Sequence, residues 1–213
     1  DPALRKDLVN PYLICPKGHS YKTRQFDTKT PTFDKNFNGW TAPFIMATIN
    51  TRIVFRSNAL LNYAYGEDFK YDEAMLVGKG LKGRLTATAI VGALGAFFIG
   101  AAIKPTRWLL SNYMLPKPGE GPTPKEQVEG YYDIRFIGKT ASGQEIRTKV
   151  IGQGDPGYGS TSQMLGQVGA CLALDTELLA DKPGGFWTTS TLLGDRLIER
   201  LEKDAKLTFE VLN

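Results

Sequence analysis

The amino-acid sequence predicts an α+β fold in which a mixed or antiparallel sheet is flanked by helices. The first observation is a hairpin: residues 131–138 and 144–152 alternate apolar and polar side chains on either side of the turn KTASGQ. The second is the order of elements, because helical segments surround this hairpin without the regular strand-helix-strand alternation of a parallel sheet. The alternation predicts a sheet with one buried and one solvated face.

Composition narrows the chemistry that the chain can perform. Its 213 residues include one His and two Cys, and they are enough to bury a core. Cys15 and Cys171 lie far apart, and His19 stands alone in a polar stretch, so we expect no metal site and no Ser-His-Asp triad. The first 30 residues are charged and contain several prolines, unlike a secretory signal, which favours an intracellular protein. The residues identify no catalytic group.

The N-terminal part divides near residue 39. Residues 1–38 read as an irregular polar segment, and residues 39–213 as the folded domain. Beyond Trp40 the chain becomes apolar and β-branched, which predicts a strand followed by a helix over residues 56–65 that begins at Ser57 or Asn58.

Two cations in this region are candidate ligands for an anion. Arg52 and Arg56 are four residues apart, so they share a face only if this stretch is helical. They are candidates for an anion or phosphate contact. The alternative is a pair of solvated cations beside a core segment.

The segment GKGLKG, residues 78–83, matches the G-x-G-x-x-G pattern of dinucleotide-binding proteins. That pattern works with a strand before it, a helix after it and an acid about 20 residues later that binds the ribose. A short strand and an apolar helical segment can be read around it, but no Asp or Glu lies between Glu73 and Glu120. We therefore interpret three glycines as a turn from strand to helix that binds no cofactor: Gly78, Gly80 and Gly83.

Residues 85–103 carry no charge and predict an apolar helix close to the length that crosses a bilayer. Small residues recur at every fourth position from Thr88 to Gly100, a face on which another helix can pack. Two interpretations stay open: a buried helix of a soluble domain, or a helix that lies on or dips into a membrane or lipid surface, which is preferred to a true span. The candidate membrane contacts are Phe97, Phe98, Ile99 and Trp108.

The cations around this helix do not indicate nucleic acid. They bracket an apolar run instead of forming a patch with interleaved aromatic side chains, so we expect no nucleic-acid partner.

A Pro/Gly linker over residues 115–124 leads to the hairpin, and after the hairpin GDPGYGSTSQMLG predicts a turn that opens a helix. Ser160 and Gln163 have the spacing of a capping box. Free N–H groups and the positive end of the helix dipole favour an anion or a polar ligand atom there. Tyr158, Ser160 and Thr161 form this candidate cleft or anion site. Simple capping beside a packed tyrosine is the alternative.

The C-terminal stretch repeats the arrangement of a turn followed by a helix. GGFWTTSTLLGDRLIERLEK predicts an amphipathic helix capped near Thr189 or Ser190, and LTFEVL predicts a terminal strand. The apolar face of the helix is expected to consist of Leu192, Leu193, Leu197, Ile198 and Leu201.

Three motifs, LPKPGEGP, GDPGYGSTSQMLG and GGFWTTSTLLGDRLIERL, resemble the C-terminal half of the saccharopine dehydrogenase-like oxidoreductases. This group includes the trans-acting enoyl reductases of mycobacterial lipid synthesis. The resemblance runs from about Gly39 to the end. It implies a two-domain enzyme whose N-terminal Rossmann domain binds NAD or NADP, and whose second α+β domain shapes the substrate side and mediates dimerisation.

The resemblance further implies NAD(P)-linked chemistry on a lipid-related substrate, and association with membranes or lipid droplets. It places this chain in the second domain, which alone binds no cofactor and is inactive, and it transfers no catalytic residue. Because the chain begins at Asp1 without Met, we expect it to be part of a longer polypeptide. The competing hypothesis is a non-catalytic membrane- or lipid-droplet-associated module that uses helix 85–103. One departure is that EKDAKLTFEV lacks the glycine expected before the terminal strand.

Overall fold

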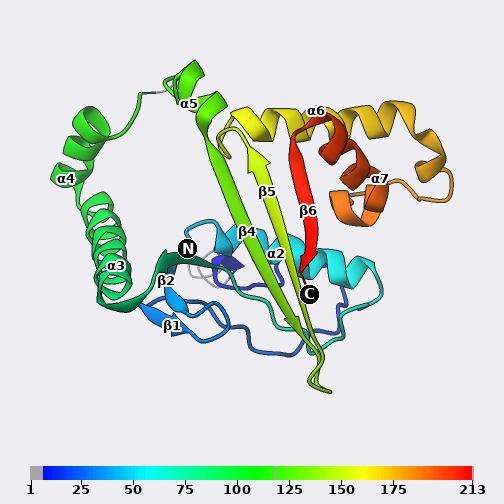
Figure 1. Cartoon of the computed structure of the whole chain (residues 1–213), viewed down its shortest axis with the longest axis horizontal. Helices are drawn as coiled ribbons and strands as arrows, with labels where there is room; N and C mark the ends of the chain where they lie inside the picture. The colour runs from blue at the N-terminus through cyan, green and yellow to red at the C-terminus, as the bar shows by residue number, and fades with distance from the viewer. Residues whose placement is uncertain (1–6, 118, 213) are drawn as a thin grey trace. The chain divides into compact units, whose positions relative to one another are not determined.

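Two three-stranded antiparallel sheets organise the chain, one in each of two units, residues 1–118 and 119–213 (Figure 1). The computed structural model describes residues 7–117 and 119–212. Helices accompany both sheets, which confirms the α+β class and selects the antiparallel alternative. The boundary between the units lies within the predicted linker 115–124. The extents of the predicted domains stay a prediction.

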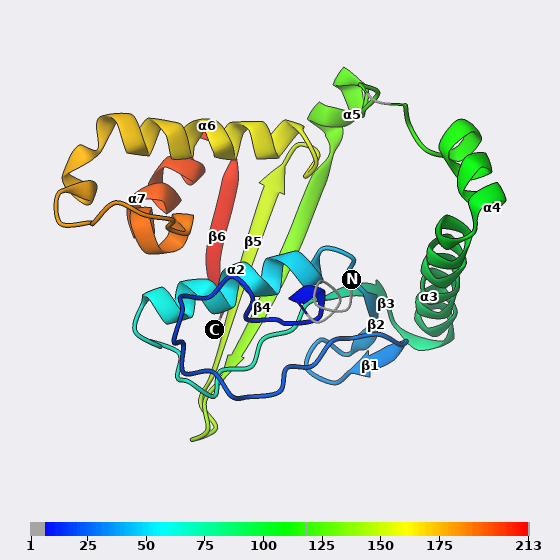
Figure 2. The same ribbon diagram turned by 180° about the vertical axis from the view of Figure 1, so that it is seen from behind.

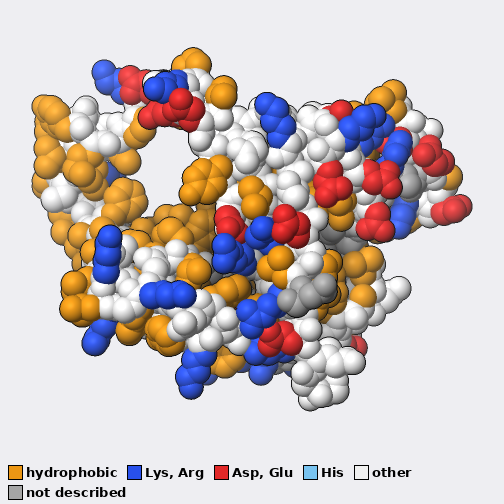
Figure 3. Space-filling view, viewed as in Figure 1, with side chains coloured by type: hydrophobic (Ala, Val, Ile, Leu, Met, Phe, Trp, Pro, Cys, Tyr) orange, Lys and Arg blue, Asp and Glu red, His pale blue; other side chains and the backbone are white. Residues whose placement is uncertain are grey.

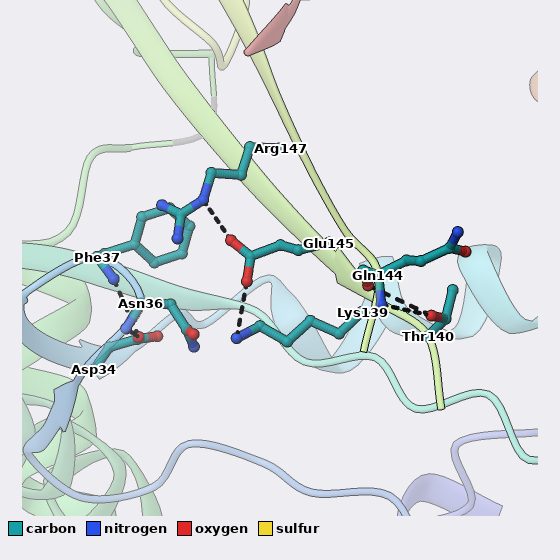
Figure 4. A network of polar contacts seen from close by, with 8 residues as sticks. All are labelled: Asp34, Asn36, Phe37, Lys139, Thr140, Gln144, Glu145 and Arg147. Carbon is teal, nitrogen blue, oxygen red and sulfur yellow. Dashed lines mark hydrogen bonds and ion pairs between the residues drawn. The ribbon is translucent and has the colours of Figure 1, made fainter. Parts of the chain in front are cut away.

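The sheet of the first unit has the order β1-β2-β3. Its strands are β1 (Thr32–Asp34), β2 (Gly39–Pro43) and β3 (Ala74–Gly78), and the ladder between β2 and β3 shifts register between Trp40 and Thr41. At the corner after β1, the carboxylate of Asp34 accepts hydrogen bonds from backbone N–H groups (Figure 4). Strand β1 lies in the segment, residues 1–38, that the sequence suggested would be irregular, whereas β2 and β3 lie beyond it.

Helix α2 (Ala47–Leu60) corrects the prediction of a strand followed by a helix that starts at residue 57 or 58. The strand ends at Pro43 and the helix begins nine residues before Arg56. The β-branched residues suggested a strand. In the helix, however, the Thr51 hydroxyl donates a hydrogen bond to the carbonyl of Ala47, and Phe55 is fully buried. Burial of one helical face outweighs a modest propensity difference.

The core of the first unit is aromatic. Tyr12 and Tyr21 stack with ring centroids 4.6 Å apart, and both meet the ring of Phe55 edge-on. The buried amide of Asn58 donates to the Tyr21 hydroxyl at 2.7 Å. The N-terminal segment therefore supplies core residues, although its backbone is largely irregular.

After β3 the chain forms α3 (Gly80–Ala102), α4 (Lys104–Leu109) and the π-helix η1 (Leu110–Met114). The predicted apolar helix over 85–103 is confirmed as a helix, but it begins five residues earlier, inside the glycine segment. Gly83 explains this start, because a Cβ there would lie 2.4 Å from the carbonyl oxygen of Gly78. Glycine thus lets the first helical turn lie against the end of β3.

The second unit contains the predicted hairpin as β4 (Tyr131–Lys139) and β5 (Glu145–Gln153), and the predicted terminal strand as β6 (Leu207–Leu212), in the order β4-β5-β6. Its helical elements are α5 (Pro124–Glu129), α6 (Gly159–Leu174), the 3-10 helix η2 (Thr176–Leu179) and α7 (Thr189–Asp204). Figure 2 shows α6 and α7 beside this sheet. Together they confirm the predicted C-terminal elements.

The core of the second unit is aliphatic. Cys171 of α6 and three leucines of α7 are buried with Leu207 of β6, and Val150 and Phe209 pack against them. The apolar face predicted for α7 is confirmed at its centre, whereas Ile198 is partly exposed. The helix cap is Thr188, one residue before the first of the two predicted positions, Thr189 and Ser190, with Thr191 as its reciprocal partner.

The other face of this sheet carries ion pairs. Glu145 accepts from Lys139 at 3.1 Å and from Arg147 at 2.6 Å (Figure 4), and Lys149 meets Glu210 at 2.9 Å. This is the solvated face that the alternating pattern predicted. Before β6, Lys206 adopts φ 56°, so a lysine takes the left-handed position where a glycine was expected.

Candidate functional site

The GDPGYGS turn between β5 and α6 is closed by Asp155. Its carboxylate accepts hydrogen bonds from the N–H groups of Gly159 at 2.6 Å, Gly157 at 2.8 Å and Tyr158 at 3.1 Å. These bonds, with that from Gly159 the strongest influence, hold the pKa of Asp155 below its usual range. At the start of α6 the N–H group of Gly159 is thus occupied by a side chain of the turn, and that of Ser160 donates to the backbone carbonyl of Asp155.

The capping box predicted from Ser160 and Gln163 is wrong. Ser160 is the second residue of α6 and is fully buried, and its hydroxyl lies 3.0 Å from that of Tyr132 on β4. Tyr132 in turn covers Gly152 of the neighbouring strand so closely that a Cβ there would overlap its ring. Ser160 therefore ties α6 to the sheet.

The other two predicted residues of this turn differ in what they offer. Thr161 donates its hydroxyl proton to the carbonyl of Pro156 at 2.7 Å. The side chain of Tyr158 is 59% exposed, and its ring lies beside Gly121, where a Cβ would be 3.5 Å away. Tyr158 is the member of this set that presents a phenol to solvent.

Arg52 and Arg56 lie on α2, so the condition that they share a helical face is met. The guanidinium of Arg52 donates to the carbonyl of Leu8, and that of Arg56 donates to the carbonyl of Ile14. Both arginines hold the N-terminal segment against α2. Both arginines belong to the first unit, whereas Tyr158, Ser160 and Thr161 belong to the second, so the two sets are described separately.

The glycine segment forms the predicted turn from strand to helix. Gly78 and Gly80 have φ of 116° and 60°, and α3 begins at Gly80 with no side-chain cap. The strand before it belongs to an antiparallel sheet, which is not the parallel arrangement of a dinucleotide-binding unit. Its geometry is accounted for by helix-strand packing at Gly83 and by the cation-π contact of Arg84 with Trp40.

Helix α3 has the length and composition of a membrane-crossing helix. Only 6% of its apolar 18-residue window is buried, unlike the core helix of a soluble protein. In Figure 3 hydrophobic side chains gather over α3 and α4. An apolar groove of about 310 Å³ runs between α3 and the α4–η1 segment. Its lining includes Phe97, and all four candidate membrane contacts are exposed, Phe97 the least of them: Phe97, Phe98, Ile99 and Trp108.

Two polar features of the described residues were not recognised from the sequence. Asp175, buried at the end of α6, accepts from Arg200 at 2.7 Å and from Arg196 at 2.9 Å. A depression of about 380 Å³ is lined by polar residues: Ser20, Lys22, Thr23, Glu67 and Asp68. The arginines recur four residues apart on α7, a signal that could have suggested a shared acidic partner. Among the described residues, no three His, Cys, Asp or Glu side chains are grouped to hold a metal ion.

Comparison with known proteins places these observations in a family context. A trans-acting enoyl reductase candidate of Mycobacterium tuberculosis is 38% identical over 210 residues, which cover 94% of this chain and 50% of that protein. Trans-acting enoyl reductases of Mycobacterium bovis and Mycobacterium ulcerans are 40% and 36% identical over 167 residues, covering 76% of the chain and 39% of their own length. No family model and no solved structure matches the chain.

These homologues support an enoyl reductase-like family, and their names indicate an oxidoreductase-like function. The chain spans about half the length of the curated relatives that it matches.

Proposed function

We propose that the chain is the substrate-side and dimerisation portion of an NAD(P)-dependent oxidoreductase of the saccharopine dehydrogenase-like type, acting on a lipid-related enoyl substrate. The observation that carries this proposal is the 38% identity over 94% of the chain to a trans-acting enoyl reductase candidate. The α+β architecture is compatible with a second domain that follows a Rossmann domain. In such an enzyme the cofactor lies on the Rossmann domain and not on Gly78, Gly80 or Gly83.

Enoyl reduction adds a hydride to one carbon of a C=C bond and a proton to the other. NAD(P)H supplies the hydride, and an acid within reach of the substrate supplies the proton. Of the side chains at the GYGST turn, Tyr158 is the exposed phenol, on a turn that Asp155 holds by three N–H contacts. We therefore assign Tyr158 as the candidate proton donor on this side of the cleft.

Cofactor binding tests the oxidoreductase assignment. The polypeptide encoded at the natural locus and residues 1–213 alone would each be titrated with NADPH and NADH by fluorescence, with the mass of the natural polypeptide measured first. We expect the natural polypeptide to bind one of the two cofactors if it contains a Rossmann domain, and residues 1–213 to bind neither. No binding by the natural polypeptide would overturn the assignment. Binding by residues 1–213 would indicate that the glycine turn 78–83 binds the cofactor after all.

Tyr158→Phe in the complete enzyme tests the assigned acid. Loss of a general acid is expected to lower kcat by roughly 10²- to 10⁴-fold with little change in cofactor affinity. Tyr131→Phe removes another exposed phenol from the same unit and is the matched control. Equal kcat values for the two variants would exclude Tyr158 as the donor and leave the cofactor assignment standing.

A second candidate function is a non-catalytic module that attaches to membranes or lipid droplets. The observation that favours it is the exposure of α3, whose most apolar window is 6% buried. Flotation of residues 1–213 with anionic vesicles tests it, with Phe97→Ser/Phe98→Ser as the variant. Unchanged flotation would exclude the apolar helix from attachment. A matched control, Ile49→Ser/Ile53→Ser, removes two exposed apolar side chains from α2.

A further inference from the structure

The segment α3–α4–η1 leaves the sheet of the first unit after two turns. Gly83 and Ala87 are the buried residues of α3, and both lie in its first eight residues. Beyond them the segment turns back on itself at Ile103, and Leu110 of η1 comes within 3.4 Å of where a Cβ of Gly100 would lie. Its exposed apolar residues include Leu85, Phe98, Ile99, Ile103, Trp108, Leu109, Tyr113 and Met114.

The short polar side chains of this segment all donate to its own backbone. Thr86, Thr88, Ser111 and Asn112 each donate to the carbonyl four residues earlier, at 2.7 to 3.0 Å. Thr106 donates at the helix break, where its hydroxyl lies 2.5 Å from the carbonyl of Gly100 and 3.0 Å from that of Ile103. Such internal bonding is needed where water is absent, because unpaired polar groups are costly in hydrocarbon.

The charges at the two ends of the apolar run 85–103 indicate which partner the α3–α4–η1 hairpin binds. Residues 74–119 contain six cations and no acid. Three precede the apolar run and three follow it, among them Lys104 and Arg107. A second copy of the same hairpin would bring like charges together, whereas an anionic lipid surface complements them.

The free length of α3 is short for a span. Residues 80–87 lie against β2 and β3, so about 15 residues remain from Thr88 to Ala102. At 1.5 Å per residue they reach about 22 Å, whereas the hydrocarbon core is about 30 Å thick.

Insertion tip-first is also disfavoured. Lys104 and Arg107 follow directly on the break at Ile103, so a perpendicular hairpin would carry both cations toward the bilayer centre. A hairpin that lies along the interface keeps the cations on both sides of the apolar run among the headgroups, and places Trp108 and Tyr113 at the depth that aromatic side chains prefer.

We propose that the α3–α4–η1 hairpin embeds in one leaflet of an anionic bilayer and lies along its interface, with acyl chains filling the groove between α3 and η1. This deepens the membrane attachment proposed above, because it states the lipid charge and the topology. It also implies that both units lie on the same side of the bilayer.

Lipid charge is tested by flotation of the whole chain with vesicles of phosphatidylcholine alone or mixed with phosphatidylglycerol. Lys104→Gln/Arg107→Gln is expected to weaken binding to the anionic vesicles by roughly 30-fold. Lys17→Gln/Lys35→Gln removes the same charge outside the hairpin and should leave binding unchanged. Equal binding to both vesicle types would overturn the anionic requirement, and flotation with neither would overturn the membrane attachment itself, independently of the cofactor titration.

Topology is tested by adding one cysteine to each unit, Lys35→Cys or Ser142→Cys, and synthesising the chain in the presence of sealed vesicles. A membrane-impermeant maleimide should label both positions fully, with no gain on adding detergent, relative to the parent chain. Protection of one of the two positions would show that the chain spans the bilayer and would overturn the proposal.

Depth is tested by fluorescence with brominated lipids. Bromine near the headgroups should quench Trp108 more strongly than bromine near the bilayer centre, and Trp108→Phe identifies its share of the signal. Stronger quenching by the deep bromine would show tip-first insertion and would also overturn the proposal.

Discussion

Helices α3 and α7 both follow a turn, yet they meet their surroundings in opposite ways. In α7 one stripe is buried, with Leu193 3% exposed, and the other faces carry charge. In α3 apolar side chains surround the helix, and Ile99 is 65% exposed. An amphipathic stripe is satisfied by one neighbouring layer, whereas a helix that is apolar all round requires apolar surroundings on every side.

The comparison shows that hydrophobicity and burial are separate properties of a helix. The less apolar helix, α7, carries the core of the second unit, and the more apolar one contributes two small buried residues to the first. Stability is therefore expected to respond strongly to substitutions in α7 and weakly to substitutions in the free part of α3.

The largest effect is expected from Leu193→Ala. Removing a buried leucine leaves a cavity and should lower the free energy of unfolding of the second unit by about 2–5 kcal/mol. Urea unfolding followed by Trp187 fluorescence measures it. Ile198→Ala, on the same helix but 37% exposed, is the control and should cost clearly less. Equal losses would mean that the stripe on α7 is not what holds the unit together.

A smaller effect distinguishes two glycines of α3. Gly83→Ala places a Cβ 2.4 Å from the carbonyl oxygen of Gly78 and should destabilise the first unit by about 1–3 kcal/mol. At Gly95 a Cβ meets no atom within 4 Å, so Gly95→Ala should stabilise the helix by about 0.5–1 kcal/mol.

Thermal unfolding followed by Trp40 fluorescence compares the two glycine variants. A stabilising Gly83→Ala would show that α3 does not pack on β3 as described.

Acid is expected to affect the second unit. Hydrogen bonds from Arg200 and then Arg196 hold the pKa of Asp175 well below its usual range. A carboxyl whose folded pKa is depressed contributes stability above its unfolded pKa, about 3.9, and loses it as the pH falls toward the folded value. Urea midpoints reported by Trp187 should therefore fall below about pH 4, and Asp175→Asn should remove much of that dependence.

Alkali is expected to affect the first unit. Burial raises the pKa of the Cys15 thiol to about 11 and that of Tyr21 to about 12. Because the folded pKa values are raised and the neutral forms are favoured, this stability is present below the unfolded values and is lost as the pH rises through the folded ones. Trp40 should report a lower urea midpoint above about pH 9, whereas Trp187 should change less. Equal decreases of the urea midpoint at Trp40 and Trp187 would contradict the prediction that alkali destabilises the first unit more than the second.

The sequence allowed the C-terminal elements to be predicted better than the N-terminal ones, for a physical reason. The hairpin, α7 and β6 rest on local periodicity, and they were confirmed with small shifts at their ends. The core roles of Tyr12, Tyr21 and Phe55 depend on contacts between residues more than 30 positions apart. Local pattern does not contain such contacts.

The candidate site shows the same limit. The sequence located the turn that opens α6 but assigned its cap to Ser160, because the S-x-x-Q spacing is a local signal. The N-cap residue is Tyr158, which makes no side-chain cap; Asp155 accepts from the N–H groups of the turn, and Ser160 is buried against Tyr132. Tyr158 is the residue whose exposure keeps it available for the proposed chemistry.

The smallest expected effect is on the stability of the free part of α3. Phe98 is 57% exposed, so Phe98→Ser in the absence of vesicles should change the free energy of unfolding by no more than about 0.5 kcal/mol. The same variant should weaken flotation with anionic vesicles, because it removes apolar area that the lipid covers. A loss of stability as large as that of Leu193→Ala would mean that α3 is covered in solution by a second copy. In that case α3 would be buried by protein, as α7 is, but between two copies of the chain and not within one.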